Sequence, residues 1–189
     1  MKEAAGIRVQ RLGILLSVTP FRQRPGYCGP ASLKMVLDFY GVRVSEKRLV
    51  ELSGCTRSAG VSADGLLMAA ATFGFGGAIK DNCELRDLRH HVQKRNTPVI
   101  VDWFDFDGGH YSVVIGIDRE NVYLQDPGLG HRRALKLRTF KRLWFDFPGD
   151  FVQDKDDLIV RRMLVIRPGK ELQGRRQSEK RSSGASETR

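Results

Sequence analysis

Cysteine is scarce in this chain, which has only Cys28, Cys55 and Cys83 among its 189 residues. An odd number of thiols cannot pair completely in disulfides, and no Cys-x-x-Cys unit occurs with the spacing of structural zinc sites. The composition therefore excludes a disulfide-rich secreted scaffold and a zinc finger. We expect free thiols, no metal and no other cofactor.

Long hydrophobic runs are also missing. The only apolar stretch near the N-terminus covers residues 13–18, which is too short to cross a membrane, and no small-residue cleavage site follows it. We therefore expect no transmembrane segment and no secretory signal peptide. A cytoplasmic location follows as the default, and this reducing compartment would keep a reactive thiol active.

Positive charge is in excess, with a net charge of +10, and such a balance suggests a nucleic-acid partner. However, Lys and Arg are spread along the chain, and their densest stretch, at residues 132–142, alternates with leucines. This alternation predicts the solvent face of a strand and a short helix. We therefore expect no nucleic-acid site, and attraction to an acidic peptide or to an anionic lipid surface fits the charge equally well.

Helical patterns occupy the first half of the chain and short β-branched runs the second. Helices are predicted at residues 30–40, 46–52, 63–73 and 84–94. Strands are predicted at residues 7–21, 98–103, 111–117, 121–125 and 158–166, with a hairpin turn at 118–121. This order is typical of an α+β fold. Residues 1–167 are expected to form one domain, and 168–189, polar and basic, a disordered C-terminal tail.

Cys28 begins the clearest helix signal in the chain. Pro30 suits the first helical turn, where its missing N–H is not needed, and Gly41 ends the helix. Free backbone N–H groups and the positive end of the helix dipole favour a thiolate over a thiol, and a cysteine nucleophile requires the thiolate. For a lone thiol, a buried structural cysteine at the start of a core helix is the alternative.

Of the four histidines, His110 is placed most like a general base, because it heads the strand expected over 111–117. By itself it also fits a polar residue that caps a buried strand. If that strand pairs with 121–125, His110 and Asp126 become cross-strand neighbours. A carboxylate there would accept the imidazole N–H and fix its tautomer. Alone, an aspartate before proline more often forms a turn.

Gln23 lies five residues before Cys28 in a loop. The tetrahedral intermediate of acyl transfer needs hydrogen-bond donors around its oxyanion. The side-chain amide of Gln23 and the backbone N–H of Cys28 would supply them. On spacing alone, Gln23 fits a surface glutamine as well.

Five motifs follow one another in the chain. They are Gln23, Cys28-Gly-Pro-Ala-Ser, Pro98-Val-Ile-Val, Gly109-His110-Tyr-Ser-Val-Val and Gln125-Asp126-Pro127. From about residue 16 to 167 the chain resembles the bacteriocin-processing (double-glycine leader) peptidase family, a branch of the papain-like cysteine peptidases. This resemblance implies a papain-like α+β fold with N-terminal helices packed on an antiparallel sheet. It also implies that Cys28 is the nucleophile, His110 the general base, Asp126 the orienting carboxylate and Gln23 the oxyanion-hole amide.

The family's reaction is hydrolysis of a peptide bond after a small, often Gly-Gly, motif through a thioester acyl-enzyme. The resemblance thus implies a cysteine peptidase with a peptide or protein substrate. Because the chain has no membrane helices and no Gly-x-x-x-x-Gly-Lys-Ser/Thr loop, we expect a stand-alone domain without the ABC transporter. Two alternatives stay open: a catalytically silent peptide-binding module of the same fold, and an acyltransferase that uses the same triad.

Overall fold

The computed structural model describes residues 15–106, 108–149, 151–170 and 172. The helices are α1 (Cys28–Phe39), α2 (Glu46–Ser53), α3 (Ala63–Ala71), α4 (Leu85–Arg89) with the π-helical turn η1 (His90–Lys94), α5 (Leu137–Leu143) and the 3-10 turn η2 (Lys155–Asp157). The strands are β1 (Phe75–Lys80), β2 (Val99–Asp105), β3 (Gly108–Ile117), β4 (Asn121–Asp126), β5 (His131–Lys136), β6 (Phe145–Asp146), β7 (Ile159–Val160) and β8 (Met163–Pro168).

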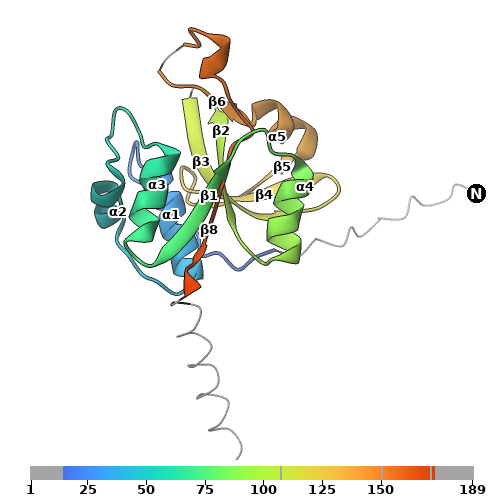
Figure 1. The fold of residues 1–189 in the computed structure, drawn as a ribbon. Helices are drawn as coiled ribbons and strands as arrows, with labels where there is room; N and C mark the ends of the chain where they lie inside the picture. Colours follow the sequence, from blue (N-terminus) through green and yellow to red (C-terminus); the bar gives the residue numbers. More distant parts are fainter. Residues whose placement is uncertain (1–14, 107, 150, 171, 173–189) are drawn as a thin grey trace, which may run out of the picture.

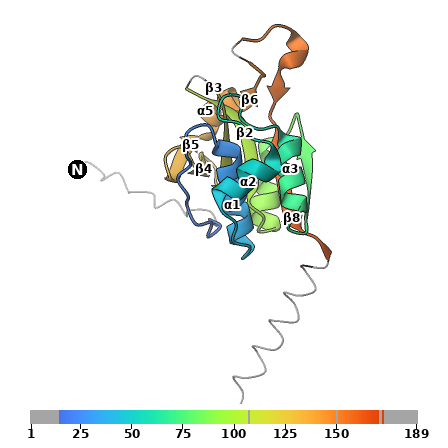
Figure 2. The ribbon, with the colours of Figure 1, turned by 90° about the vertical axis from the view of Figure 1, so that its left-hand side faces the viewer.

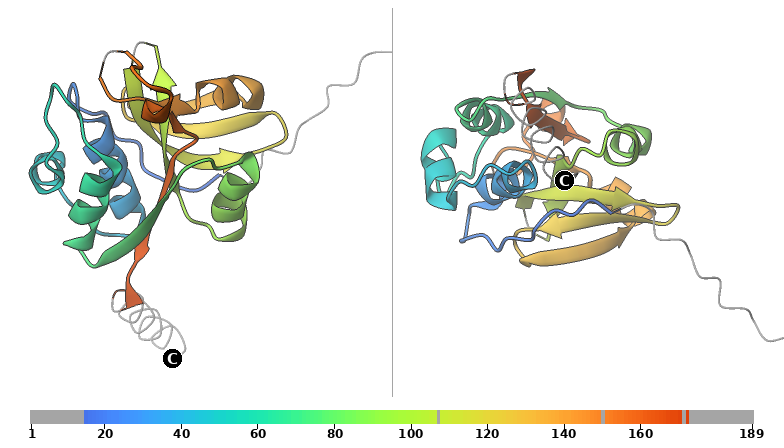
Figure 3. Two further views of the ribbon diagram at one scale, coloured as in Figure 1. Left: turned by 45° about the horizontal axis from the view of Figure 1, so that its top comes forward. Right: turned by 90° about the horizontal axis from the view of Figure 1, so that it is seen from below.

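Six strands form one antiparallel sheet in the order β1-β8-β2-β3-β4-β5, and β6 pairs with β7 in a separate ribbon. Figure 1 shows α1, α2 and α3 grouped on one side of this sheet and α4 and α5 on the other. In Figure 2 the first three helices lie in front of the strands, and both views of Figure 3 keep them together as a layer. The predicted α+β class is confirmed.

Local signals set most of the predicted helix ends. The Ser45 hydroxyl accepts the Arg48 N–H at 3.2 Å and begins α2, which ends at Gly54 with a φ of 67°. The Ser62 hydroxyl accepts the Gly65 N–H at 3.1 Å and begins α3. The four helices predicted in the first half of the chain are therefore confirmed, although the last one ends in the π-helical turn η1.

The strand predicted over residues 7–21 is wrong in its described part, since residues 15–21 form no strand, and residues 7–14 lie outside the described residues. Isolated bonds hold this segment instead: the Leu16 N–H donates to the Ile115 carbonyl at 2.8 Å. The Gln125 amide donates to the Val18 carbonyl at 2.6 Å. The strand β1, at the sheet edge, was not predicted. It contains Gly76 and Gly77, and glycine has low strand propensity.

The buried core joins α1 to the sheet. Leu33, Val36 and Leu37 are fully buried, as the helical spacing predicts. The predicted tail begins at the end of β8, and its residues 171 and 173–189 lie outside the described residues. Among the helices that the structure describes, none has the length and apolar character that crossing a membrane requires.

Candidate active site

Cys28 is the first residue of α1 and is half-buried. Its N-cap, Tyr27, makes no side-chain capping bond, and the first turn carries no acidic residue. The N–H groups of this turn therefore have no side-chain acceptor of their own, and the positive end of the helix dipole faces the thiol. Such an end stabilises negative charge on sulfur or on a nearby oxygen.

Two contacts set α1 against β3. The buried Ser32 hydroxyl donates to the Tyr111 carbonyl at 3.1 Å, one residue from His110. Gly29 allows the helix to approach this closely, because a Cβ there would overlap the Val61 side chain and lie 3.2 Å from the Tyr111 ring. The packing of the core thus determines the distance between Cys28 and the strand that carries His110.

His110 lies near the start of β3 and pairs with Trp103 on β2. The imidazole meets the Trp103 indole edge-on, with 5.9 Å between ring centroids. Its Nε2 lies 3.0 Å from Oδ1 of Asp126. Because Nε2 is engaged in this way, Nδ1 is the nitrogen available to the Cys28 thiol.

Asp126 ends β4, and its side chain is only 1% exposed. Oδ1 accepts from His110, from the Gly128 N–H at 2.9 Å and from the Leu129 N–H at 3.3 Å, and Oδ2 accepts from Arg133 at 2.9 Å. Burial alone would raise the pKa of Asp126, but the hydrogen bonds and positive charges of His110 and Arg133 outweigh it and lower the pKa to about 2. The carboxyl group therefore stays ionised at neutral pH.

The pKa of His110 is raised from 6.5 to about 9. Burial by itself lowers it, but hydrogen bonds to Asp126 and Cys28, together with the negative charges of both groups, have the larger effect. The imidazole is consequently protonated at neutral pH. An imidazolium bonded to a buried carboxylate is a proton donor with a defined orientation.

The Gln23 backbone N–H donates to the Pro127 carbonyl at 2.9 Å, which places its loop beside the turn that follows Asp126. The side-chain Oε1 is buried and has no hydrogen-bond partner among the described residues. The structure thus brings the loop of Gln23 to the turn after β4, beside the pair formed by His110 and Asp126.

Sequence reasoning missed Arg133, which it assigned to a solvent-facing basic stretch. The guanidinium binds Asp126 and also Asp105 at the end of β2. Asp105, His110 and Asp126 offer ligand atoms within 4.8 Å of one another, so they could in principle hold a cation. Arg133 already binds both carboxylates there, and a metal ion would have to displace it. The alternation of charge and leucine along β5 gave no signal for this role.

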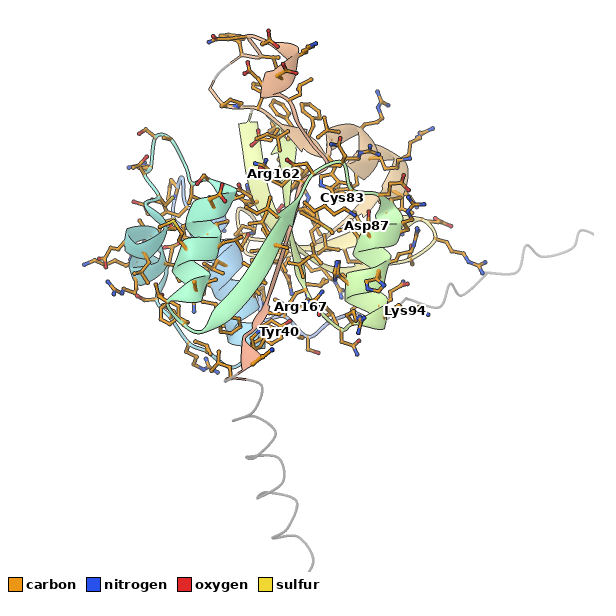
Figure 4. All side chains as sticks on the ribbon, in the orientation of Figure 1. Tyr40, Cys83, Asp87, Lys94, Arg162 and Arg167 are labelled. Atoms are coloured by element: carbon orange, nitrogen blue, oxygen red, sulfur yellow. The ribbon has the colours of Figure 1, made fainter. Side chains whose placement is uncertain are left out.

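Among the described contacts, the side chains of the other two cysteines and of the histidine on β5 are not bonded to the side chains of His110 or Asp126, although the Cys55 thiol lies 3.8 Å from the Gly26 carbonyl, two residues before Cys28. Cys55 and Cys83 are buried, and burial is the main reason that each has a pKa raised to about 11. Figure 4 shows Cys83 beside α4, in the connection after β1. His131 is exposed on β5.

Comparisons with known proteins identify the family and the fold. The model of the peptidase C39 family matches residues 21–147. An uncharacterized protein of Methanothermobacter marburgensis is 41% identical over 113 residues, which are 59% of this chain and 73% of that protein. The transport/processing ATP-binding protein ComA of Streptococcus pneumoniae is 32% identical over 126 residues, which are 62% of this chain but only 16% of ComA.

Solved structures share the fold. The peptidase domain of Streptococcus ComA superposes with a TM-score of 0.63 at 22% identity, over 80% of this chain and 98% of that domain. A double-glycine-motif protease from an AMS/PCAT transporter, solved with its leader peptide, gives a TM-score of 0.59 at 21% identity, over 82% of this chain and 94% of that one. The predicted papain-like fold is thereby confirmed, and the chain belongs to the peptidase C39 family.

Proposed function

We propose that this protein is a cysteine peptidase in which Cys28 is the nucleophile, His110 transfers the proton and Asp126 orients the imidazole. The observation that carries the proposal is the position of His110, whose Nε2 lies 3.0 Å from a buried carboxylate and whose pKa the neighbouring Cys28 side chain helps to raise. A nucleophile, a base and an orienting group in this order are what acyl transfer requires.

In the first step the Cys28 thiolate attacks the carbonyl carbon of the substrate, a C–S bond forms and the carbonyl oxygen becomes an oxyanion. The His110 imidazolium gives its proton to the leaving nitrogen, and the C–N bond breaks to leave a thioester. Water then attacks the thioester and gives a proton to the now neutral His110. When the C–S bond breaks, the acid product leaves, and the thiolate–imidazolium pair is restored.

Two donors are proposed for the oxyanion: the backbone N–H of Cys28 and the side-chain amide of Gln23. The first is supported by the uncapped start of α1, where no side chain competes for the N–H groups. The second is supported by the burial of the Gln23 side chain, whose Oε1 has no hydrogen-bond partner among the described residues. The turn after Asp126 holds the Gln23 backbone, since the Gln23 N–H donates to the Pro127 carbonyl.

The proposed substrate is a peptide or protein cleaved after small residues such as Gly-Gly. Support comes from the relative that was solved as a double-glycine-motif protease with its leader peptide. The thiol must be reduced for this reaction, so we also propose a reducing, cytoplasmic setting.

Cleavage can be tested on a broad mixture of peptides. The protein and its Cys28→Ala variant are incubated with a proteome-derived peptide library in H₂¹⁸O, and new termini are identified by mass spectrometry. Hydrolysis predicts new C-termini that carry one ¹⁸O, absent with the variant. Ligated products without ¹⁸O would identify an acyltransferase instead. Peptides retained by both proteins without any new terminus would identify a binding module.

The reactive pair can be tested separately by brief treatment with limiting iodoacetamide, followed by intact-mass analysis. We expect a single fast modification at Cys28, because Cys55 and Cys83 are buried with a pKa of about 11 each. The variant His110→Ala should react slowly, whereas His131→Ala, an exposed histidine on β5, serves as the matched control. Equal rates for the wild type and His110→Ala would refute the thiolate–imidazolium pair.

A further inference from the structure

Arg133 forms the most connected charge cluster beside the proposed triad. From β5 its Nη1 donates to Oδ2 of Asp126 and to Oδ2 of Asp105, each at 2.9 Å, and its Nη2 lies 3.5 Å from Oδ1 of Asp105. The guanidinium also stacks over the Trp103 ring, 5.0 Å from its centroid. One side chain thereby joins the ends of β2, β4 and β5.

We propose that Arg133 is a positioning residue of the catalytic machinery: it holds the Asp126 carboxylate in the orientation that aligns His110 with Cys28. This inference rests on the proposed function. Asp105 and Trp103 contribute to this positioning, because they hold the guanidinium in place.

The two oxygens of Asp126 have separate partners. Oδ1 accepts hydrogen bonds from His110 and from two backbone N–H groups. The only partner of Oδ2 among the described contacts is Arg133. The Asp126 side chain is 1% exposed, so water cannot replace a lost donor. Without Arg133, Oδ2 would be a buried anionic atom without a partner, and the carboxyl group would rotate or take up a proton.

The second carboxylate at Arg133, that of Asp105, has an electrostatic role. A guanidinium bonded to Asp126 alone would compete with the imidazolium for the same negative charge. Asp105 shares Arg133, so one guanidinium stands between two carboxylates, and Asp126 keeps negative charge for His110. Arginine suits this position better than lysine, because its planar fork bonds both carboxylates while its face packs on an indole.

Trp103 is a platform for both cationic groups. The His110 ring meets the indole edge-on, and Arg133 stacks on it, so both are placed relative to one rigid, fully buried side chain. Arg133 is 24% exposed and Asp105 likewise, which is more burial than an ordinary surface ion pair has. The geometry is that of a supporting contact for a functional histidine, comparable to the outer partners of metal-bound histidines.

The test measures the second-order rate of Cys28 alkylation by iodoacetamide at pH 7. Arg133→Met is expected to slow alkylation by about tenfold, the lower range of losses when a partner that orients a functional histidine is removed. Arg133→Lys keeps one charged bond and should restore part of the rate. The matched control is Arg132→Met, an exposed arginine on the same strand, which should react like the wild type.

A double-mutant cycle separates positioning from a structural role. If Arg133 acts through Asp126, Arg133→Met should change the rate by less than about twofold in an Asp126→Asn background, since the partner through which it acts is gone. The same tenfold loss in both backgrounds, or no loss in the wild-type background, would overturn the inference.

A second variant keeps the test decisive if Arg133→Met does not fold. Asp105→Asn leaves Asp126 and Arg133 intact but removes one anchor of the guanidinium, and it should slow alkylation by a smaller factor. A wild-type rate for Asp105→Asn would then overturn the inference. Failure of the proposed function looks different, because in that case His110→Ala itself would react as fast as the wild type.

Discussion

Asp126→Asn is the most informative single change, because asparagine has the same shape but no charge. Two backbone N–H groups, of Gly128 and Leu129, point at Oδ1, so the amide oxygen must take that position. The NH₂ group then faces the Arg133 guanidinium, donor against donor. The variant therefore loses its charge interaction with His110 and its bond to Arg133, while the backbone turn is kept.

The size of the effect follows from the Asp126 pKa, which the native contacts lower from 3.8 to about 2. At about 1.4 kcal/mol per tenfold change in affinity for the proton, this corresponds to about 2 kcal/mol of folding free energy at pH 7. For a lowered carboxyl pKa, this stability is present above about pH 4 and is lost as the pH falls through about 2. The wild type should therefore exceed Asp126→Asn by about 2 kcal/mol at pH 7.

At alkaline pH, the stability difference between the wild type and Asp126→Asn depends on His110. Its pKa is raised to about 9, so its contribution is complete below 6.5, the ordinary value, and is lost as the pH rises through about 9. The pKa shifts of Asp126 and His110 arise from the same contact between the two side chains, so their free energies are not added. Urea unfolding of the wild type and of Asp126→Asn at pH 3, 6 and 10 should give the largest difference at pH 6. Equal stability at pH 6, or a difference that does not shrink by pH 10, would refute this account.

Two further changes probe the surroundings of the site by unfolding experiments. A Cβ at Gly109 would overlap the Asp146 carboxylate, so Gly109→Ala should cost about 1–3 kcal/mol, whereas Gly76→Ala, which meets open space, should not. Equal effects of both alanines would contradict this. Burial, followed by the charge of Asp146, raises the pKa of Asp102 to about 8, so the native protein loses stability between about pH 4 and 8. Asp102→Asn has no such carboxyl group, so its free energy of unfolding relative to the wild type should rise over that range in urea titrations. A difference between the two proteins that stays constant with pH would argue against a buried acid.

Much of the fold could be predicted from the sequence because its signals are local. The capping serines at 45 and 62, and Gly54 at the end of α2, act within one helical turn, and the structure confirms all three. The hairpin between β3 and β4 is equally local: the Asp118 carboxylate accepts the N–H groups of Glu120 and Asn121 within the turn. A tight turn of this kind determines which strand ends meet, so the proximity of His110 and Asp126 could be predicted.

Other features depend on partners far apart in the chain. Residues 15–21 looked like a strand by alternation, but they join β3 and β4 through isolated hydrogen bonds and through the buried side chains of Leu16 and Val18. The edge strand β1 pairs with β8, nearly ninety residues later, and its glycines give no strand signal of their own. The acid pair of Asp102 and Asp146 likewise joins two segments that no sequence pattern connects.

Capping, periodicity and tight turns act over a few residues, so the α+β order of elements, the helix that begins at Cys28 and the hairpin between β3 and β4 follow from local sequence. The role of Arg133 does not, because its basic stretch is typical of a solvated face, and it binds Asp126 and an aspartate 28 residues earlier only in the folded sheet. The energy of that cluster comes from burial and from the convergence of three strand ends, and neither exists until the sheet has formed.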